Sequence, residues 1–98
     1  MAEFQEMDGK LFINGKEVLK GWESWSGWVW FATEEIQKQT SLVNGRWVKD
    51  TIWFGFVQGF EEDWGDFSQA ELESLRPWVW EIRKQDLPCS GRRRELKV

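Results

Sequence analysis

The sequence predicts an α+β fold that is rich in β-structure, with about five to six mainly antiparallel strands and one short helix near residues 69–76. Two Asn-Gly pairs between β-prone segments indicate hairpins, and a capping-box motif indicates the helix. A length of 98 residues fits one domain of ordinary size. We therefore expect a single domain over residues 1–98, with an irregular or mobile tail over residues 85–98.

The first expected element is a hairpin over residues 10–19, because Asn14 and Gly15 supply the two positive-φ residues of a tight turn. Residues 21–27 are bounded by glycines, which predicts a loop. Residues 28–33 are aromatic or β-branched and are apolar on both alternating faces. This pattern predicts a strand that is covered on both sides.

A second turn is predicted at Asn44 and Gly45, and residues 50–59 form the strongest strand signal in the chain. The even-numbered positions of that strand form one wholly apolar face, which predicts burial. On its other face Gly55 lies between two bulky side chains. A glycine at such a position indicates a bulge or a close approach to a large neighbouring side chain.

The expected helix begins at Ser68, which forms a capping box with Glu71. Leu72 and Leu75 share one face of the helix, and Pro77 ends it. A helix of about two turns is unstable alone in water, so it must dock against the rest of the protein.

Residues 78–83 alternate in character and predict a final strand. The chain has nine Trp, seven Phe and no Tyr, so aromatic side chains must supply much of the core. Five tryptophans lie on expected strands and are therefore expected to be buried: Trp28, Trp30, Trp53, Trp78 and Trp80.

Three segments resemble a small bacterial and archaeal family of unknown function whose genes lie near plasmid or phage-type genes. Residues 28–34 carry the W-x-W-F-A-T-E strand of that family, residues 54–59 are placed on its F-x-G-x-V-x-G strand, and residues 65–73 carry its G-x-F-S-x-x-E-L-E helix entry. The resemblance covers roughly residues 25–76. This resemblance implies that the protein originates from a mobile element. It implies no activity and no catalytic residue, because none is known for the family.

The residue types exclude most catalytic machinery. The chain has no His, which removes His-based triads, His general bases and His-ligated metals. Its one cysteine, Cys89, excludes an internal disulfide and a four-cysteine metal site. The acidic group Glu61, Glu62, Asp63 and Asp66 is expected in the turn between the strongest strand and the helix, and it lacks the ligand spacing of a calcium loop. We therefore expect a protein that is not an enzyme and that has no catalytic residue, no metal and no cofactor.

Charge is distributed unevenly along the chain, although the net charge is only −4. Residues 50–75 contain seven acids and no base, whereas residues 76–98 contain seven bases and three acids. Proteins that bind duplex nucleic acid normally present a basic stripe to the phosphates. This distribution indicates a solvated acidic face with a basic tail, or an asymmetric surface for a partner.

The tryptophans of predicted loops and turns are candidate anchors for a partner, because Trp concentrates binding energy in small interfaces. Together with the acidic group, they form the candidate partner-binding set: Trp22, Trp25, Trp47, Trp64, Glu61, Glu62, Asp63 and Asp66. An alternative is a single-stranded nucleic-acid binder that stacks bases on exposed Trp. Its phosphate contacts would come from the C-terminal basic residues: Arg83, Lys84, Arg92, Arg93 and Arg94.

The function predicted from the sequence is therefore a non-enzymatic protein-interaction module. Its partner is an unidentified protein, nucleic acid is the disfavoured alternative, and a homodimer is left open. Apolar stretches of four or five residues predict no membrane partner. An acidic amino terminus and a single cysteine predict a cytoplasmic location.

Overall fold

The computed structural model describes residues 3–90, which form eight strands in two antiparallel sheets and one short α-helix. This confirms the predicted fold class, although the strand count exceeds the expected five to six. In chain order the elements are β1 (Phe4–Met7), β2 (Lys10–Ile13), β3 (Lys16–Glu17), β4 (Lys20–Ser24), β5 (Val29–Val43), β6 (Arg46–Gln58), β7 (Glu62–Ser68), α1 (Gln69–Glu73), β8 (Val79–Ile82) and the 3₁₀ helix η1 (Lys84–Asp86).

The two sheets are a three-stranded β1-β2-β3 sheet and a five-stranded sheet with the order β7-β6-β5-β4-β8. Both predicted Asn-Gly turns are present. Asn14 and Gly15 join β2 to β3 with φ values of 51° and 82°, and Asn44 and Gly45 join β5 to β6 with φ values of 51° and 76°. Positive φ at both central residues gives the hairpin a twist that matches its strands.

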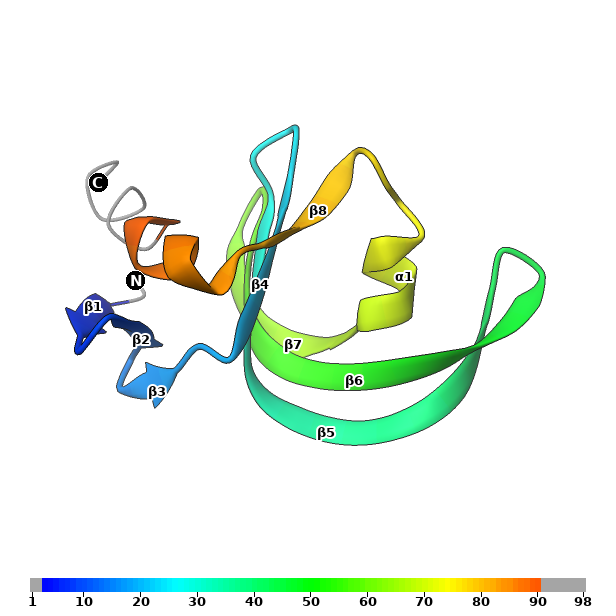
Figure 1. Ribbon diagram of the computed structural model, residues 1–98, viewed down its shortest axis with the longest axis horizontal. Coiled ribbons are helices and arrows are strands. Elements are labelled where there is room, and N and C mark those ends of the chain that lie inside the picture. The colour runs from blue at the N-terminus through cyan, green and yellow to red at the C-terminus, as the bar shows by residue number, and fades with distance from the viewer. Residues whose placement is uncertain (1–2, 91–98) are drawn as a thin grey trace.

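The β5–β6 hairpin is the longest feature of the fold, and it bends strongly beneath α1 (Figure 1). Its pairing register shifts twice, between Ala32 and Glu34 and again between Glu35 and Gln37. Each shift leaves one extra residue on β5, and such bulges bend and twist a strand pair. The bend places the helix inside the curve of the sheet and lets the hairpin tip project from the body.

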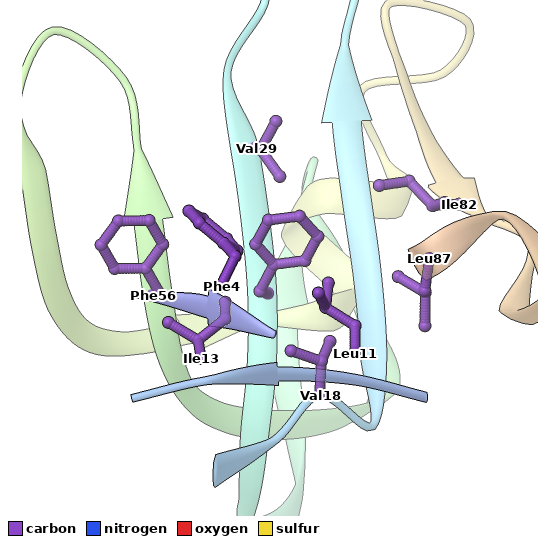
Figure 2. Packing of buried hydrophobic residues seen from close by; sticks show 9 residues of the cluster. Phe4, Leu11, Ile13, Val18, Val29, Phe56, Ile82 and Leu87 are labelled. Atoms are coloured by element: carbon purple, nitrogen blue, oxygen red, sulfur yellow. The ribbon is translucent and has the colours of Figure 1, made fainter. Parts of the chain in front are cut away.

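Apolar side chains fill both faces of the five-stranded sheet. On one face the three-stranded sheet covers a cluster of Phe4, Leu11, Ile13, Val18, Val29, Phe31, Phe56, Ile82 and Leu87, and β1 and β2 lie across the strands beneath them (Figure 2). On the other face Leu72 of α1 packs in a second cluster with Trp22, Ala32, Trp53 and Val79 of the sheet. Neighbouring residues such as Phe31 and Ala32 enter different clusters, because successive strand residues point to opposite faces.

Gly55 lies in close contact with its neighbour, as predicted, but the neighbouring group is the backbone of β5 and not a large side chain. It pairs with Ala32 on β5 and with Gly65 on β7. A Cβ atom at Gly55 would lie 1.9 Å from the Phe31 carbonyl oxygen, which is backbone and cannot move aside. Only glycine fits here.

The predicted loop over residues 21–27 is wrong in its first half, since β4 extends to Ser24. β4 pairs on one side with β5, the next strand in the chain, and on the other side with the distant β8, and these two partners hold the glycine-bounded segment extended. The turn expected to carry the acidic group is also largely strand, because β7 adds to the free edge of β6.

The C-terminal part of the described chain is more ordered than predicted. The expected tail over residues 85–98 is wrong as far as Ser90, because η1 and a helical turn over residues 87–90 follow β8. Leu87 is 4% exposed and enters the core opposite Gly21. The helix is shorter than expected, since α1 ends at Glu73 and turns continue to β8.

Of the five tryptophans expected in the core, Trp53 is buried, Trp28 and Trp30 are partly buried, and the other two are exposed. Trp78 is 60% exposed and Trp80 is 41% exposed, so the prediction of burial was wrong for both. β8 is a four-residue edge strand that buries only Val79 and Ile82. Trp78 precedes the strand in a turn, and Trp80 has a neighbouring strand on one side only.

Candidate functional site

Aromatic side chains that are far apart in sequence gather at one end of the molecule. They come from the β4–β5 turn, the start of β5, the β6–β7 turn and the connection between α1 and β8, which lie toward the top of Figure 1. Trp25, Phe60 and Trp78 are 72%, 95% and 60% exposed. We name this surface the aromatic platform and define it as Trp25, Trp28, Trp30, Phe60, Leu75 and Trp78.

Ring contacts join the members of the platform in two groups. Trp25 and Trp78 meet edge to face, with ring centroids 6.3 Å apart. Trp28 stacks on Trp30 at 6.0 Å and meets Phe60 edge to face at 5.4 Å. These geometries are the ones that aromatic pairs prefer, so the rings support each other while they remain open to solvent.

Backbone hydrogen bonds fix the turn that presents Trp25. Gly27 N–H donates to the Ser24 carbonyl at 3.0 Å, and Trp28 N–H donates to the Ser24 hydroxyl at 3.1 Å. Trp25 N–H donates to the Trp78 carbonyl at 2.9 Å, which ties the β4–β5 turn to the start of β8. The platform is therefore held by the backbone of the fold and not by the aromatic contacts alone.

Two shallow depressions run across the platform and share Trp28. One, of about 240 Å³, lies between the two tryptophan pairs and is also lined by Leu75. The other, of about 560 Å³, extends from Trp28 and Phe60 toward the β7 edge. Its outer wall carries three exposed carboxylates, which we name the acidic rim: Glu61, Asp63 and Asp66. Within residues 3–90 none of the three forms an ion pair.

The four tryptophans predicted as anchors lie in different places and differ in their exposure to solvent. Trp25 belongs to the platform, as described, whereas Trp22 is fully buried and cannot be a surface anchor. Trp64 is half-buried against Phe54 and Phe56, and the Lys16 ammonium lies 5.5 Å from its ring centroid. Trp47 is 70% exposed but lies at the tip of the β5–β6 hairpin, away from the platform.

The predicted acidic residues lie together, apart from one. Glu61, Asp63 and Asp66 form the acidic rim, while the Glu62 carboxylate accepts a hydrogen bond from the Gln58 amide at 3.3 Å. Within the described part of the chain no group of three or more His, Cys, Asp or Glu side chains is arranged to hold a metal ion.

The basic residues of the alternative hypothesis lie at the other end of β8 from Trp78. Arg83 is exposed and forms an ion pair with Asp86 at 3.0 Å, and Lys84 begins η1. Trp80 shares a depression of about 510 Å³ with Arg83, and it is the one tryptophan that lines it. Arg92, Arg93 and Arg94 fall outside the described residues.

One buried carboxylate has a shifted pKa, and its role is structural. Burial alone would raise the pKa of Asp50, but hydrogen bonds from the Ser68 hydroxyl, the Ala70 N–H and the Ser41 hydroxyl outweigh burial and lower it. The Ser68 hydroxyl in turn accepts the Glu71 N–H at 3.1 Å, which confirms the predicted cap. Asp50 thereby fixes the start of α1 to β6.

Sequence reasoning missed most of the platform, namely Trp28, Trp30, Phe60, Leu75 and Trp78. Phe60 had a signal, because it follows a glycine and precedes three acids in a turn, where burial is unusual for a large ring. Trp78 follows Pro77, which places it in the turn before the strand.

No helix within residues 3–90 is long and apolar enough to cross a membrane. Comparisons of the chain with family models, with curated proteins and with solved structures gave no match. The resemblance to the family found near plasmid and phage-type genes therefore stays a prediction.

Proposed function

We propose that this protein is a non-enzymatic protein-interaction module that binds its partner on the aromatic platform. The partner segment carries Lys or Arg side chains beside apolar ones. The apolar side chains enter the depression between the two tryptophan pairs, and the cationic groups lie against the acidic rim or over the indole faces.

The observation that carries this proposal is the exposure of the platform. Three large rings stand 60–95% exposed side by side, although the same chain buries Trp22 and Phe31 completely. Contiguous exposed apolar surface is rare on monomers and marks interaction sites. Trp and Phe are also enriched at the centres of protein interfaces.

The charge distribution supports a partner that is basic. Glu61, Asp63 and Asp66 flank the platform and outnumber the one exposed base beside it in the chain, Arg76, whereas Arg83 and Lys84 lie beyond the far end of β8. A surface that combines open aromatic rings with acids attracts cations and repels phosphates. This arrangement favours a basic protein segment over a nucleic acid.

A displayed library of random peptides tests the proposal. Peptides are selected on the wild-type protein and counter-selected on the double variant Trp25→Ser, Trp78→Ser. We expect enrichment of sequences that combine Lys or Arg with aromatic or aliphatic residues. Failure to enrich any sequence over the counter-selection, or enrichment of acidic sequences, would contradict the proposal.

The selected peptides then give a quantitative test. Trp78→Ala should weaken peptide binding by at least about tenfold, as the loss of a central aromatic anchor does. Asp63→Asn combined with Asp66→Asn should weaken binding less and should flatten its dependence on salt. Trp80→Ala is the matched control, because Trp80 is an exposed tryptophan of the same strand region that lies outside the platform.

A further inference from the structure

The tip of the β5–β6 hairpin is a second exposed apolar surface. Leu42 and Trp47 pair directly across the hairpin, and they are 57% and 70% exposed. Residues that pair across two strands lie on the same face, so the two side chains form one apolar patch. We name the end of the hairpin that carries this patch the hairpin tip and define it as Leu42, Val43, Arg46, Trp47 and Lys49. Lys49 shares the face of the patch, whereas the Val43–Arg46 pair lies on the opposite face at the last paired position.

The hairpin tip does not contribute to the core that the structure describes. Neither of the two apolar clusters includes a tip residue, and within residues 3–90 the Trp47 ring has no aromatic partner. The tip projects from the body of the molecule beyond α1 (Figure 1). A hairpin that only had to turn the chain would need no exposed Trp at this position.

The charge of the hairpin tip is opposite to that of the acidic rim. Residues 41–49 contain Arg46 and Lys49 and no acid, and both bases are exposed. Within the described chain neither base forms an ion pair. The tip therefore combines exposed apolar side chains with cationic ones, which is the chemistry that the aromatic platform accepts.

We propose that the hairpin tip of one copy of this chain docks on the aromatic platform of a second copy. Trp47 and Leu42 enter the depression lined by Trp25 and Trp78, while Arg46 and Lys49 lie against the acidic rim. The inference rests on the proposed function, since it uses the same platform and names a second copy of the chain as an occupant.

The contact joins two different surfaces, so it is a head-to-tail contact between copies. A few side chains on each partner bury less than the 1,200 Å² or so that stable complexes need, which gives a weak association. Because opposite charges meet at its rim, the association weakens as salt is added.

A complementation experiment tests this contact. Trp47→Ser disables the tip, and Trp25→Ser with Trp78→Ser disables the platform. Sedimentation equilibrium measures the mass of each protein up to about 1 mM, which covers weak specific contacts. We expect the wild type to exceed the monomer mass of 11.7 kDa, and each variant alone to stay monomeric. An equimolar mixture of the two variants retains one intact tip–platform contact and should form dimers without larger species.

A charge exchange provides a second pair of variants if the platform substitutions impair folding. Arg46→Glu with Lys49→Glu, and Asp63→Lys with Asp66→Lys, change only exposed side chains. Each variant alone should lose self-association, and their mixture should regain it because the charges are complementary again. Met7→Ser, which removes a half-exposed apolar side chain on β1, should leave the wild-type mass profile unchanged.

The outcomes separate this inference from the proposed function. A wild-type protein that stays monomeric, a platform variant that still associates, or a mixture that stays monomeric overturns the tip–platform contact. If peptides are still selected on the platform in that case, the proposed function stands. If no peptide binds the platform either, both proposals fail.

Discussion

The nine tryptophans of this chain serve different purposes because each meets a different neighbourhood. Trp22 is fully buried between the sheet and α1, and Trp53 is nearly so, with its indole N–H donating to the Gln69 side chain at 2.9 Å. Trp25 and Trp78 stand in solvent on the platform, and Trp47 stands in solvent on the hairpin tip. Residue type alone therefore does not decide whether a tryptophan stabilises the core or forms a surface.

Gly55 gives the clearest prediction for a single residue. We expect Gly55→Ala to destabilise the protein by about 3 kcal/mol or more, because the added methyl group would overlap the Phe31 backbone and overpacked interiors have to rearrange. Gly65→Ala is the matched control, since Gly65 pairs directly with Gly55 but has open space at its Cβ position. Urea unfolding measures both variants. Equal midpoints for the two would contradict the close approach.

At the scale of elements, α1 is too short to be stable by itself. It has five residues, and isolated helices need about 12–15 residues to form even marginally in water. Leu72 anchors it in the core, and Asp50 and Ser68 accept hydrogen bonds from two N–H groups of its first turn, those of Ala70 and Glu71. The helix thus depends on contacts from β6 and β7, which precede it in the chain.

The cap predicts a dependence of stability on pH. Because hydrogen bonds lower the pKa of Asp50 below its usual value of 3.8, the ionised carboxylate stabilises the folded state. That stability is fully present above the unfolded pKa and is lost as the pH falls through the folded pKa. Asp50→Asn should therefore cost about 1.5–3 kcal/mol at neutral pH, and less in acid below both values.

Urea unfolding at neutral pH and in acid measures this difference between the wild type and Asp50→Asn. Asp66→Asn, which changes an exposed carboxylate on β7, is the control and should have little effect at either pH.

Ser68→Ala should lower the free energy of unfolding by about 0.5–2 kcal/mol, as other lost N-caps do. It should not add fully to Asp50→Asn, because the Ser68 hydroxyl bonds to Asp50. Full additivity would mean that the two groups act independently.

At the scale of the whole molecule, the exposed aromatic rings lie beside acidic side chains, which disfavours contact with the phosphates of a nucleic acid. The open rings of the platform stand beside Glu61, Asp63 and Asp66, and these carboxylates repel phosphates. Arg83 lies in a different depression, where Trp80 is the one tryptophan in the lining, and Lys84 follows Arg83 at the start of η1. The depression that joins Arg83 to an exposed ring therefore offers a single tryptophan for stacking and lies apart from the platform.

We predict that a single-stranded oligonucleotide of mixed sequence leaves the Trp emission of this protein unchanged up to high micromolar concentration at physiological salt. Stacked bases would quench exposed Trp, so the titration reports directly on the platform. A variant without residues 91–98 is the control, and the truncation starts after Ser90 because that residue is 1% exposed. Micromolar binding that survives the truncation would favour the single-stranded nucleic-acid alternative.

Local features of this fold could be predicted from the sequence, because they depend on residues close together in the chain. The Asn-Gly turns at residues 14–15 and 44–45 and the Ser68 cap are all present. Each reflects a backbone conformation or a hydrogen bond within a few residues. The β-rich class follows from the same local signals.

Part of the site could be predicted in the same way. Trp25 and the carboxylates of Glu61, Asp63 and Asp66 were expected at a partner surface because they lie in loops or in an acidic run. They now lie on one surface with Trp78 and Phe60, which no local pattern connects to them. Some residues of the candidate site can thus be predicted from the sequence, but only the fold brings them together on one surface.

The tertiary structure decided which aromatic side chains are covered. β4 became a strand because β5 and β8 pair with it from both sides, and this buried Trp22. β8 ended at the edge of the sheet, and this exposed Trp80. Periodicity records which residues share a face of a strand, but only the neighbouring strands and sheets determine whether that face is covered. The sequence determined by itself the two Asn-Gly turns and the start of the helix, because those depend on neighbouring residues, while the pairing of strands far apart in the chain assembled the aromatic platform.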